Sequence, residues 1–202
     1  MTNELQTFNL SDRVLYINDD IDNVTSCDTV KFCNNLIIKD NKIIKENTKI
    51  LEDTFKQKLK EKITPPDVDV YLNTFGGACY DGWAIHDMLR NLNNHCKVNI
   101  YAVGACLSAG TFILLSVPYE QRFAYKNTTF MIHTVSSLAV GKVAELEDSV
   151  KEAKRLNDMI FDLFMKETAI TKADLDDIYD KKKDWVITAD EALKLKLISK
   201  VI

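Results

Sequence analysis

The sequence predicts a single domain of the α/β layer class, because strand-like and helix-like runs alternate along its 202 residues. Two of these alternations are joined by glycine-containing turns, at residues 73–77 and 104–110. Hydrophobic residues make up 46% and charged residues 28% of the chain. This composition is typical of a globular protein and excludes a wholly disordered chain or a collagen-like fibre.

The N-terminal third is expected to begin with segment 13–36, which holds a strand over residues 13–17 and a helix over residues 23–36. The strand is a short β-rich apolar run closed by a polar turn, and the helix carries apolar side chains at a spacing of three. Residues 37–66 are rich in Lys, Glu and Asn and are expected to form a charged, partly mobile insert. A helix over residues 48–62 is expected within it, ended by the proline pair that follows.

Two strand-turn-helix units come next. The first combines a strand at residues 68–72, a Gly-Gly turn and a helix over residues 82–92, where apolar side chains recur at helical spacing. The second combines a strand at residues 98–103, a glycine-flanked turn and an apolar helix over residues 111–116. This alternation of strands and helices indicates an α/β layer fold.

The C-terminal part continues the alternation. Strands are expected at residues 122–125 and 128–133, and the apolar face of residues 143–164 predicts a long amphipathic helix. A strand-like run at residues 185–189 then separates a charged helix end from a new helix beginning near residue 190.

Charge and apolar patterning limit the partners and the compartment. The 26 Lys and Arg against 30 Asp and Glu give a net charge of −4, which argues against binding to nucleic acid. The first six residues lack a basic region followed by an apolar stretch, and no apolar run reaches the ~18 residues of a membrane span. We therefore expect a cytoplasmic protein without a membrane partner.

The five cysteines are an odd number and lack the spacing of zinc ligands. They are expected to be reduced thiols that pack as small hydrophobic residues, so the sequence predicts no metal site.

Three side chains are candidates for chemistry. Ser108 lies in a glycine-flanked turn between a strand and a helix, where a nucleophile is well presented, although a structural serine gives the same pattern. His133 closes an apolar strand and is the candidate base, with a core histidine as the alternative. Asp184, one acid among thirty, precedes the strand-like run at 185–189 and is the candidate third member, with a solvated surface acid as the alternative.

At this point the chain resembles the Clp peptidase proteolytic subunit family, usually called ClpP, from about residue 68 to its end and more faintly back to residue 13. The motifs stand in the family's order. They are the Asn-Thr-Phe-Gly-Gly turn at 73–77, the Gly-Trp-Ala-Ile-His-Asp helix at 82–87, the Gly-Ala-Cys-Leu-Ser-Ala-Gly-Thr-Phe turn at 104–112, Arg-Phe at 122–123 with Met-Ile-His at 131–133, the helix start at 141–147, and the C-terminal signature between 184 and 198.

The resemblance implies a role for each candidate residue. Ser108 would be the nucleophile, His133 the general base and Asp184 the carboxylate that orients it. The backbone N–H groups of Gly77 and Ala109 would form the oxyanion hole. This agrees with the properties of the two glycine-containing turns, since a Gly-Gly turn lets the backbone approach a substrate carbonyl.

The resemblance also implies a crotonase-like ClpP fold of repeated β-β-α units, with a protruding handle helix in the region 134–168. It implies self-association into heptameric rings, two of them stacked, and a ClpX-, ClpA- or ClpC-type AAA+ unfoldase as partner. No cofactor is expected in this chain, and the absence of a phosphate-binding loop agrees that the ATP is used by that unfoldase. The unfoldase would dock on an apolar surface, although an ordinary sheet core explains its residues equally well: Tyr71, Tyr101, Val103, Phe123 and Tyr125.

The function expected from the sequence is therefore a serine endopeptidase subunit of an ATP-dependent Clp-type protease, which cleaves unfolded polypeptides inside a ring-shaped chamber. Two alternatives remain open. One is a catalytically modified ClpP-like scaffold or assembly protein, and the other is a crotonase-type acyl-CoA enzyme on the same fold.

Overall fold

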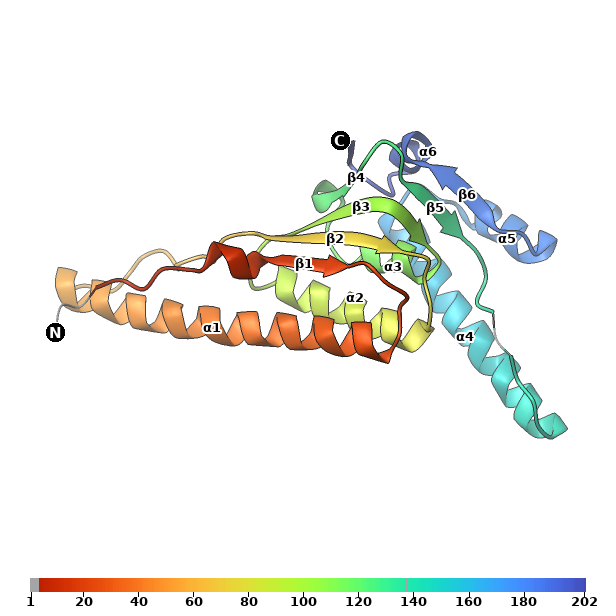
Figure 1. Ribbon diagram of the computed structural model, residues 1–202, viewed down its shortest axis with the longest axis horizontal. Coiled ribbons are helices and arrows are strands. Elements are labelled where there is room, and N and C mark those ends of the chain that lie inside the picture. Colours follow the sequence, from red (N-terminus) through yellow and green to blue (C-terminus); the bar gives the residue numbers. More distant parts are fainter. Residues whose placement is uncertain (1–3, 137) are drawn as a thin grey trace.

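A computed structural model describes residues 4–136 and 138–202 of the chain. The first three residues, and Ser137 in the expected handle region, lie outside the described residues. The molecule has a layer of helices packed under a parallel sheet, and one long helix that leaves this body (Figure 1). Within the described ranges no helix is long and apolar enough to cross a membrane.

The sheet has seven strands, five of which are parallel neighbours in the order β1 (Val14–Ile17), β2 (Val68–Thr74), β3 (Val98–Leu107), β4 (Arg122–Ala124) and β7 (Lys200–Val201). β5 (Thr129–Ile132) runs parallel to the second half of β3, and β6 (Trp185–Thr188) pairs antiparallel with β5. The predicted α/β class is confirmed, and the parallel pairing brings the carboxyl ends of β3 and β5 to one edge.

Helices cover the same face of β1, β2 and β3. α1 (Asn23–Phe55) and α2 (Cys79–Asn93) lie side by side beneath the strands, and α3 (Ala109–Leu114) follows β3 (Figure 1). Alternate residues of β2 point into this layer, where Val68, Val70 and Leu72 are fully buried. The other helices are α4 (Val143–Glu167), α5 (Lys172–Lys181) and α6 (Ala189–Lys194), and 3₁₀ turns occur at Leu10–Arg13 and Tyr119–Gln121.

α1 is much longer than the sequence predicts. The helix expected over residues 23–36 continues to Phe55, so the first part of the expected insert at 37–66 is helical, and the separate helix over 48–62 is wrong. Two tertiary contacts support the extension, because buried Asp40 pairs with Arg13, and the Asn47 amide exchanges two hydrogen bonds of 2.8 Å with the backbone of Gln6. The helix ends where Lys56 takes a left-handed conformation.

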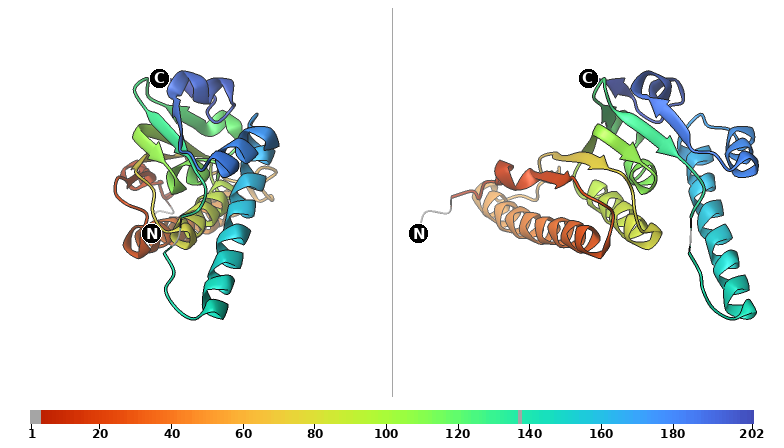
Figure 2. Two further views of the ribbon diagram at one scale, coloured as in Figure 1. Left: turned by 90° about the vertical axis from the view of Figure 1, so that its right-hand side faces the viewer. Right: turned by 45° about the vertical axis from the view of Figure 1, so that its right-hand side comes forward.

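The protruding handle helix expected from the fold is α4. Its second half packs on the body through Leu156, Ile160 and Phe164, whereas its first half projects away from the sheet (Figures 1 and 2). Val143 and Val150 on the projecting half are exposed. α4 therefore packs on the body with one half and presents apolar side chains to solvent with the other.

Candidate active site

Ser108 stands alone between two elements, because β3 ends at Leu107 and α3 begins at Ala109. Its φ is 50° and its ψ is −118°, a left-handed conformation that is strained for any residue but glycine. Its N–H donates a 2.9 Å hydrogen bond to the carbonyl of Met131, which holds the turn against the end of β5. Such a sharp strand-to-helix turn presents the hydroxyl at the edge of the sheet.

His133 reaches Ser108 because of strand register. Leu107 of β3 pairs with Met131 of β5, so the residues that follow both strands lie at the same edge of the sheet. His133 Nε2 is 2.6 Å from Ser108 Oγ, the distance of a hydrogen bond. The geometry of a nucleophile with an adjacent base is therefore present.

Asp184 meets His133 through the antiparallel pairing of β5 with β6. Ile132 pairs with Trp185, so His133, which follows Ile132, lies directly opposite Asp184, which precedes Trp185. Asp184 Oδ1 lies 3.5 Å from His133 Nδ1, within the distance of an ion pair but longer than an ordinary hydrogen bond. The Asp184 side chain is 65% exposed and that of His133 is 26% exposed, so the carboxylate is largely in contact with solvent.

The Gly-Gly turn lies beside Ser108 and is fixed by Ile21. The N–H of Ile21 donates to the Gly76 carbonyl at 2.8 Å, and the N–H of Ala78 donates to the Ile21 carbonyl at 2.7 Å. At Gly77 an added Cβ would lie 2.1 Å from the Ile21 oxygen, so only glycine fits.

The two residues whose backbone N–H groups are expected to form the oxyanion hole line one pocket. Gly77 and Ala109 line it together with Ser108 and His133. Ala109 is the first residue of α3, where the N–H has no carbonyl partner within the helix. The structure thus brings together all five residues that the sequence analysis singles out for chemistry.

A family model described as Clp protease matches residues 33–202 of the chain. The chain belongs to the Clp protease family. The ATP-dependent Clp protease proteolytic subunit of Deinococcus radiodurans is 32% identical over 136 residues, which are 67% of this chain and 65% of that protein. Proteolytic subunit 3 of Rhizobium johnstonii is 30% identical over 137 residues, which are 67% of this chain and 68% of that protein. The matched region thus spans about two thirds of the length of these curated relatives.

A solved structure gives the same result for the fold. A ClpP1 mutant from Listeria monocytogenes superposes with a TM-score of 0.73 at 22% identity, covering 95% of this chain and 92% of that chain. The chain therefore has the ClpP fold, as the motifs imply.

Four apolar residues form walls of the pocket beside Ser108, and the sequence analysis assigns none of them a place in the site. They are Cys79 at the start of α2, Phe112 of α3, and Ile160 and Phe164 of α4. Burial raises the pKa of the Cys79 thiol, which keeps it neutral and makes it an apolar wall. The sequence signals are that Phe112 ends the motif at residues 104–112 and that Cys79 follows the Gly-Gly turn by two residues.

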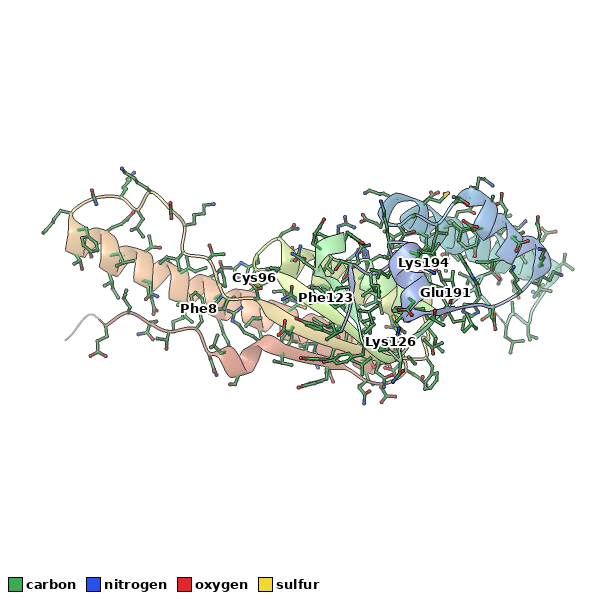
Figure 3. The ribbon with its side chains drawn as sticks, turned by 90° about the horizontal axis from the view of Figure 1, so that it is seen from above. Phe8, Cys96, Phe123, Lys126, Glu191 and Lys194 are labelled. Carbon is green, nitrogen blue, oxygen red and sulfur yellow. The ribbon has the colours of Figure 1, made fainter. Side chains whose placement is uncertain are left out.

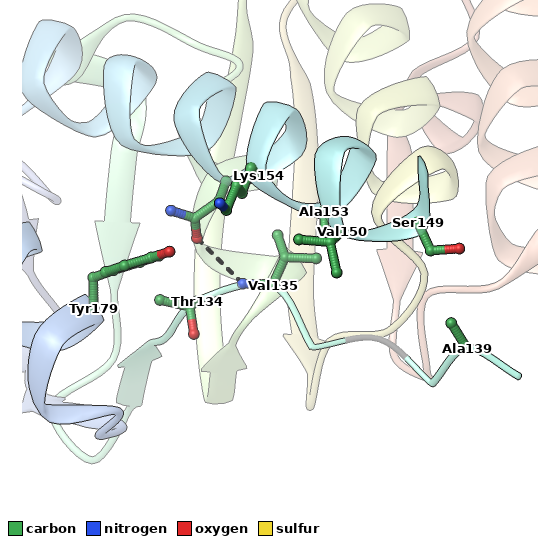
Figure 4. A pocket seen from close by; sticks show the side chains of 9 residues that line it. Thr134, Val135, Ala139, Ser149, Val150, Ala153, Lys154 and Tyr179 are labelled. Atoms are coloured by element: carbon green, nitrogen blue, oxygen red, sulfur yellow. Dashed lines mark hydrogen bonds between the residues drawn. The ribbon is translucent and has the colours of Figure 1, made fainter. Parts of the chain in front are cut away.

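Larger grooves continue from this pocket along α4. One, of about 310 Å³, lies between α4 and the segment after β5, with Thr134, Val135, Val150 and Tyr179 among its lining residues (Figure 4). The Val135 N–H donates a 3.3 Å hydrogen bond to the side-chain oxygen of buried Asn157, which fixes this segment against the helix. A second groove, of about 510 Å³, lies between α4 and the start of α2.

The rim of the second groove is tied across the two helices by Tyr80 and Glu152. The Tyr80 hydroxyl donates to the Glu152 carboxylate, which also accepts from Arg155. The hydrogen bond from Arg155, and to a lesser extent that from Tyr80, lowers the pKa of Glu152 to about 2. Glu152 is therefore ionised at neutral pH, and its charge is paired with that of Arg155.

The residues expected to dock an unfoldase lie on the sheet face away from α1 and α2. Tyr71, Tyr101 and Phe123 form a row of stacked rings with Tyr16, with neighbouring centroids 5.5, 5.2 and 5.1 Å apart. Figure 3 looks onto this face and labels Phe123. Val103 and Tyr125, the other two expected docking residues, are partly exposed and exposed, respectively. Their docking role stays a prediction.

Proposed function

We propose that this chain is a serine endopeptidase, the proteolytic subunit of an ATP-dependent Clp-type protease that cleaves unfolded polypeptides into short peptides. The observation that carries the proposal is the 2.6 Å contact between His133 Nε2 and Ser108 Oγ, in a pocket that Gly77 and Ala109 also line. The names of the curated relatives from Deinococcus and Rhizobium support the same activity.

The first step forms an acyl-enzyme. Ser108 Oγ bonds to the carbonyl carbon of the cleaved peptide while its proton moves to His133 Nε2. The negative charge that develops on the carbonyl oxygen is stabilised by the N–H groups of Gly77 and Ala109. The carbon–nitrogen bond then breaks, and His133 gives its proton to the leaving amine.

The second step releases the product. Water loses a proton to His133 Nε2 and attacks the ester, and Ser108 leaves with that proton as the carboxylic acid forms. Asp184 stabilises the imidazolium that His133 becomes in each step, through the contact at Nδ1.

The assembly is part of the proposal. We expect two stacked heptameric rings in the cytoplasm that enclose the active sites, with an AAA+ unfoldase supplying the ATP-driven step. The exposed Val143 and Val150 of the projecting half of α4 support a contact between subunits. The row formed by Tyr16, Tyr71 and Tyr101 with its neighbours supports a docking surface for the unfoldase.

The test is hydrolysis of short fluorogenic peptides by the wild type and Ser108→Ala, with particle mass measured by light scattering on the same samples. Ser116→Ala is the matched control, because Ser116 is a buried serine that lies just after α3 and does not line the pocket. We expect activity in a ring-sized particle that is lost only in Ser108→Ala. A ring in which the wild type is as inactive as Ser108→Ala would instead support the scaffold alternative.

A further inference from the structure

A further groove lies at the far end of α1, away from α4 and the active site (Figure 1). Its volume is about 660 Å³, and it runs between the second half of α1 and the chain at residues 59–65. We call it the distal groove. It belongs to segment 37–66, to which the sequence analysis assigns no function. Its apolar lining is at least partly buried and consists of Ile44, Leu59, Ile63 and Pro65.

The walls of the distal groove are tied together at one buried carboxylate. Asp40 of α1 pairs with Arg13, and Arg13 also donates a 2.7 Å hydrogen bond to the Pro66 carbonyl, at the end of the opposite wall. His95, which lines a third wall, has its Nε2 3.2 Å from the other Asp40 oxygen. The groove is therefore already formed without a ligand, as most binding sites are.

The charge of this part of the chain is opposite to that of the rest. Residues 37–66 carry eight Lys against five Asp and Glu, a net charge of +3, whereas the remaining 18 Lys and Arg and 25 Asp and Glu give −7. All eight lysines are exposed, and only Lys39 is paired with a carboxylate of the described residues. The seven without an ion pair there are Lys42, Lys45, Lys49, Lys56, Lys58, Lys60 and Lys62.

Two of these lysines, Lys60 and Lys62, line the distal groove. Glu52 and Glu61 line it as well, but the Glu52 carboxylate already accepts a 3.1 Å hydrogen bond from the Leu59 N–H. The lysines are thus surrounded by further unpaired lysines, and the charge that a ligand would meet is positive. Such a site attracts an anionic partner.

The shape of the groove fits an extended peptide. Four lining residues share one face of α1, at spacings of three and four: Asn41, Ile44, Thr48 and Glu52. At 1.5 Å per residue they span about 17 Å, the length of about five residues of a strand. On the opposite wall, the backbone of residues 60–64 makes no hydrogen bond to another described residue, so its N–H and C=O groups are free to pair with an added strand.

We propose that the distal groove binds an extended acidic segment of a partner protein, about five residues long. Its carboxylates would pair with Lys60 and Lys62, and its apolar side chains would contact Ile44 and Ile63. Nucleic acid is disfavoured because the lining contains no Phe, Tyr or Trp on which bases stack. A membrane is disfavoured because the site is concave, whereas a membrane-binding helix lays an exposed apolar face on a flat surface. The proposal does not depend on the peptidase function.

The test is fluorescence anisotropy with the labelled peptide Glu-Leu-Glu-Leu-Glu and the full-length chain carrying Ser108→Ala, so that the serine proposed above does not cleave the probe. We expect binding that weakens as the salt concentration rises, and at least about 10-fold weaker binding of the matched Gln-Leu-Gln-Leu-Gln peptide. A Lys-Leu-Lys-Leu-Lys or Gln peptide that binds as tightly as the Glu peptide would overturn the proposal.

Charge reversal tests the role of the two lysines. Lys60→Glu together with Lys62→Glu should raise the Kd of the acidic peptide at least about 10-fold, since two attractive contacts become repulsive. Lys194→Glu with Lys196→Glu is the matched control, because these lysines are also exposed, are also two residues apart and do not line the groove. Equal effects of the two double variants would overturn the proposal, because net charge alone would then explain the binding.

Filling the groove tests its shape without a change in charge. Thr48→Trp places a large side chain on the groove wall and should also raise the Kd at least about 10-fold. Thr54→Trp is the control, since Thr54 is an exposed residue of the same helix outside the groove, and it should leave the Kd unchanged. A single-stranded oligonucleotide, or vesicles of anionic lipid, bound more tightly than the acidic peptide and through Lys60 and Lys62 would overturn the choice of partner.

Discussion

Replacing Gly77 with alanine tests the link between the Gly-Gly turn and the reaction. The new Cβ would lie 2.1 Å from the Ile21 carbonyl oxygen, whereas real Cβ atoms essentially never approach closer than 3.0 Å, so the two segments must separate by about 0.9 Å. The φ of Gly77 is +150°, a conformation that side-chain-bearing residues rarely adopt, which adds strain. The N–H of residue 77 must therefore move relative to Ser108.

The expected loss follows from this displacement. A misplacement of about 1 Å costs on the order of 100-fold in rate, and removal of one oxyanion donor costs about 100- to 1,000-fold. We expect kcat/KM of Gly77→Ala to fall about 100-fold, which corresponds to about 2.7 kcal/mol of transition-state stabilisation.

The assay is hydrolysis of a short fluorogenic peptide, together with thermal unfolding by circular dichroism. Gly104→Ala is the control for strain, since Gly104 also has a positive φ, of 65°, but does not line the pocket beside Ser108. It should lower the unfolding temperature with little change in kcat/KM. A folded Gly77→Ala protein that keeps more than a third of the wild-type kcat/KM would refute the assignment of this N–H to the oxyanion.

Three further predictions concern the carboxylate proposed for the triad, a buried ion pair and a buried histidine. Asp184→Asn should lower kcat only about 10-fold, because an exposed charge 3.5 Å from the imidazole contributes about 1 kcal/mol at the dielectric constant of water; a loss above 1,000-fold in the peptide assay would contradict this. Arg122→Met should lower the free energy of unfolding in urea by about 3–5 kcal/mol, because it removes a fully buried guanidinium that contacts Glu167 and the Val117 carbonyl. Arg90→Met is the control, since Arg90 makes an exposed contact with the same glutamate, and it should lower the free energy of unfolding by under about 1 kcal/mol. Burial lowers the pKa of His86, so below about pH 6.5 the unfolded chain binds more protons than the folded protein. The free energy of unfolding should therefore fall by up to about 1.4 kcal/mol for each unit by which the pH is lowered. His86→Gln should flatten this slope in urea titrations between about pH 7.5 and 5.

The local elements were largely predictable from the chain. The strand before the Gly-Gly turn, the helix after it and the long helix α4 all follow from hydrophobic periodicity and turn residues. The extension of α1 to Phe55 was not predictable from the chain. It is accompanied by the Asp40–Arg13 pair and the Asn47–Gln6 hydrogen bonds, which join residues 27 and 41 positions apart. Such contacts leave no periodic signal in the sequence.

The functional site divides in the same way. Glycine-flanked Ser108, the strand-ending His133 and the motif around Asp184 single out the three side chains, by residue type and by resemblance to the ClpP family. The sequence alone leaves a purely structural role open for each of them, and it assigns no place in the site to Cys79 or Ile160.

By itself, the sequence determined the α/β class, the strand-turn-helix unit that carries Ser108 and the family to which the chain belongs. Only the tertiary structure decided that His133 lies 2.6 Å from Ser108, that Asp184 lies opposite His133 yet is exposed, and that Ile160 and Phe164 of α4 line the pocket beside Ser108. The physical reason is that these features depend on strand register and on the packing of a helix onto distant residues. Register and packing are set by the whole core at once, whereas periodicity and turn chemistry are set by neighbours in the chain.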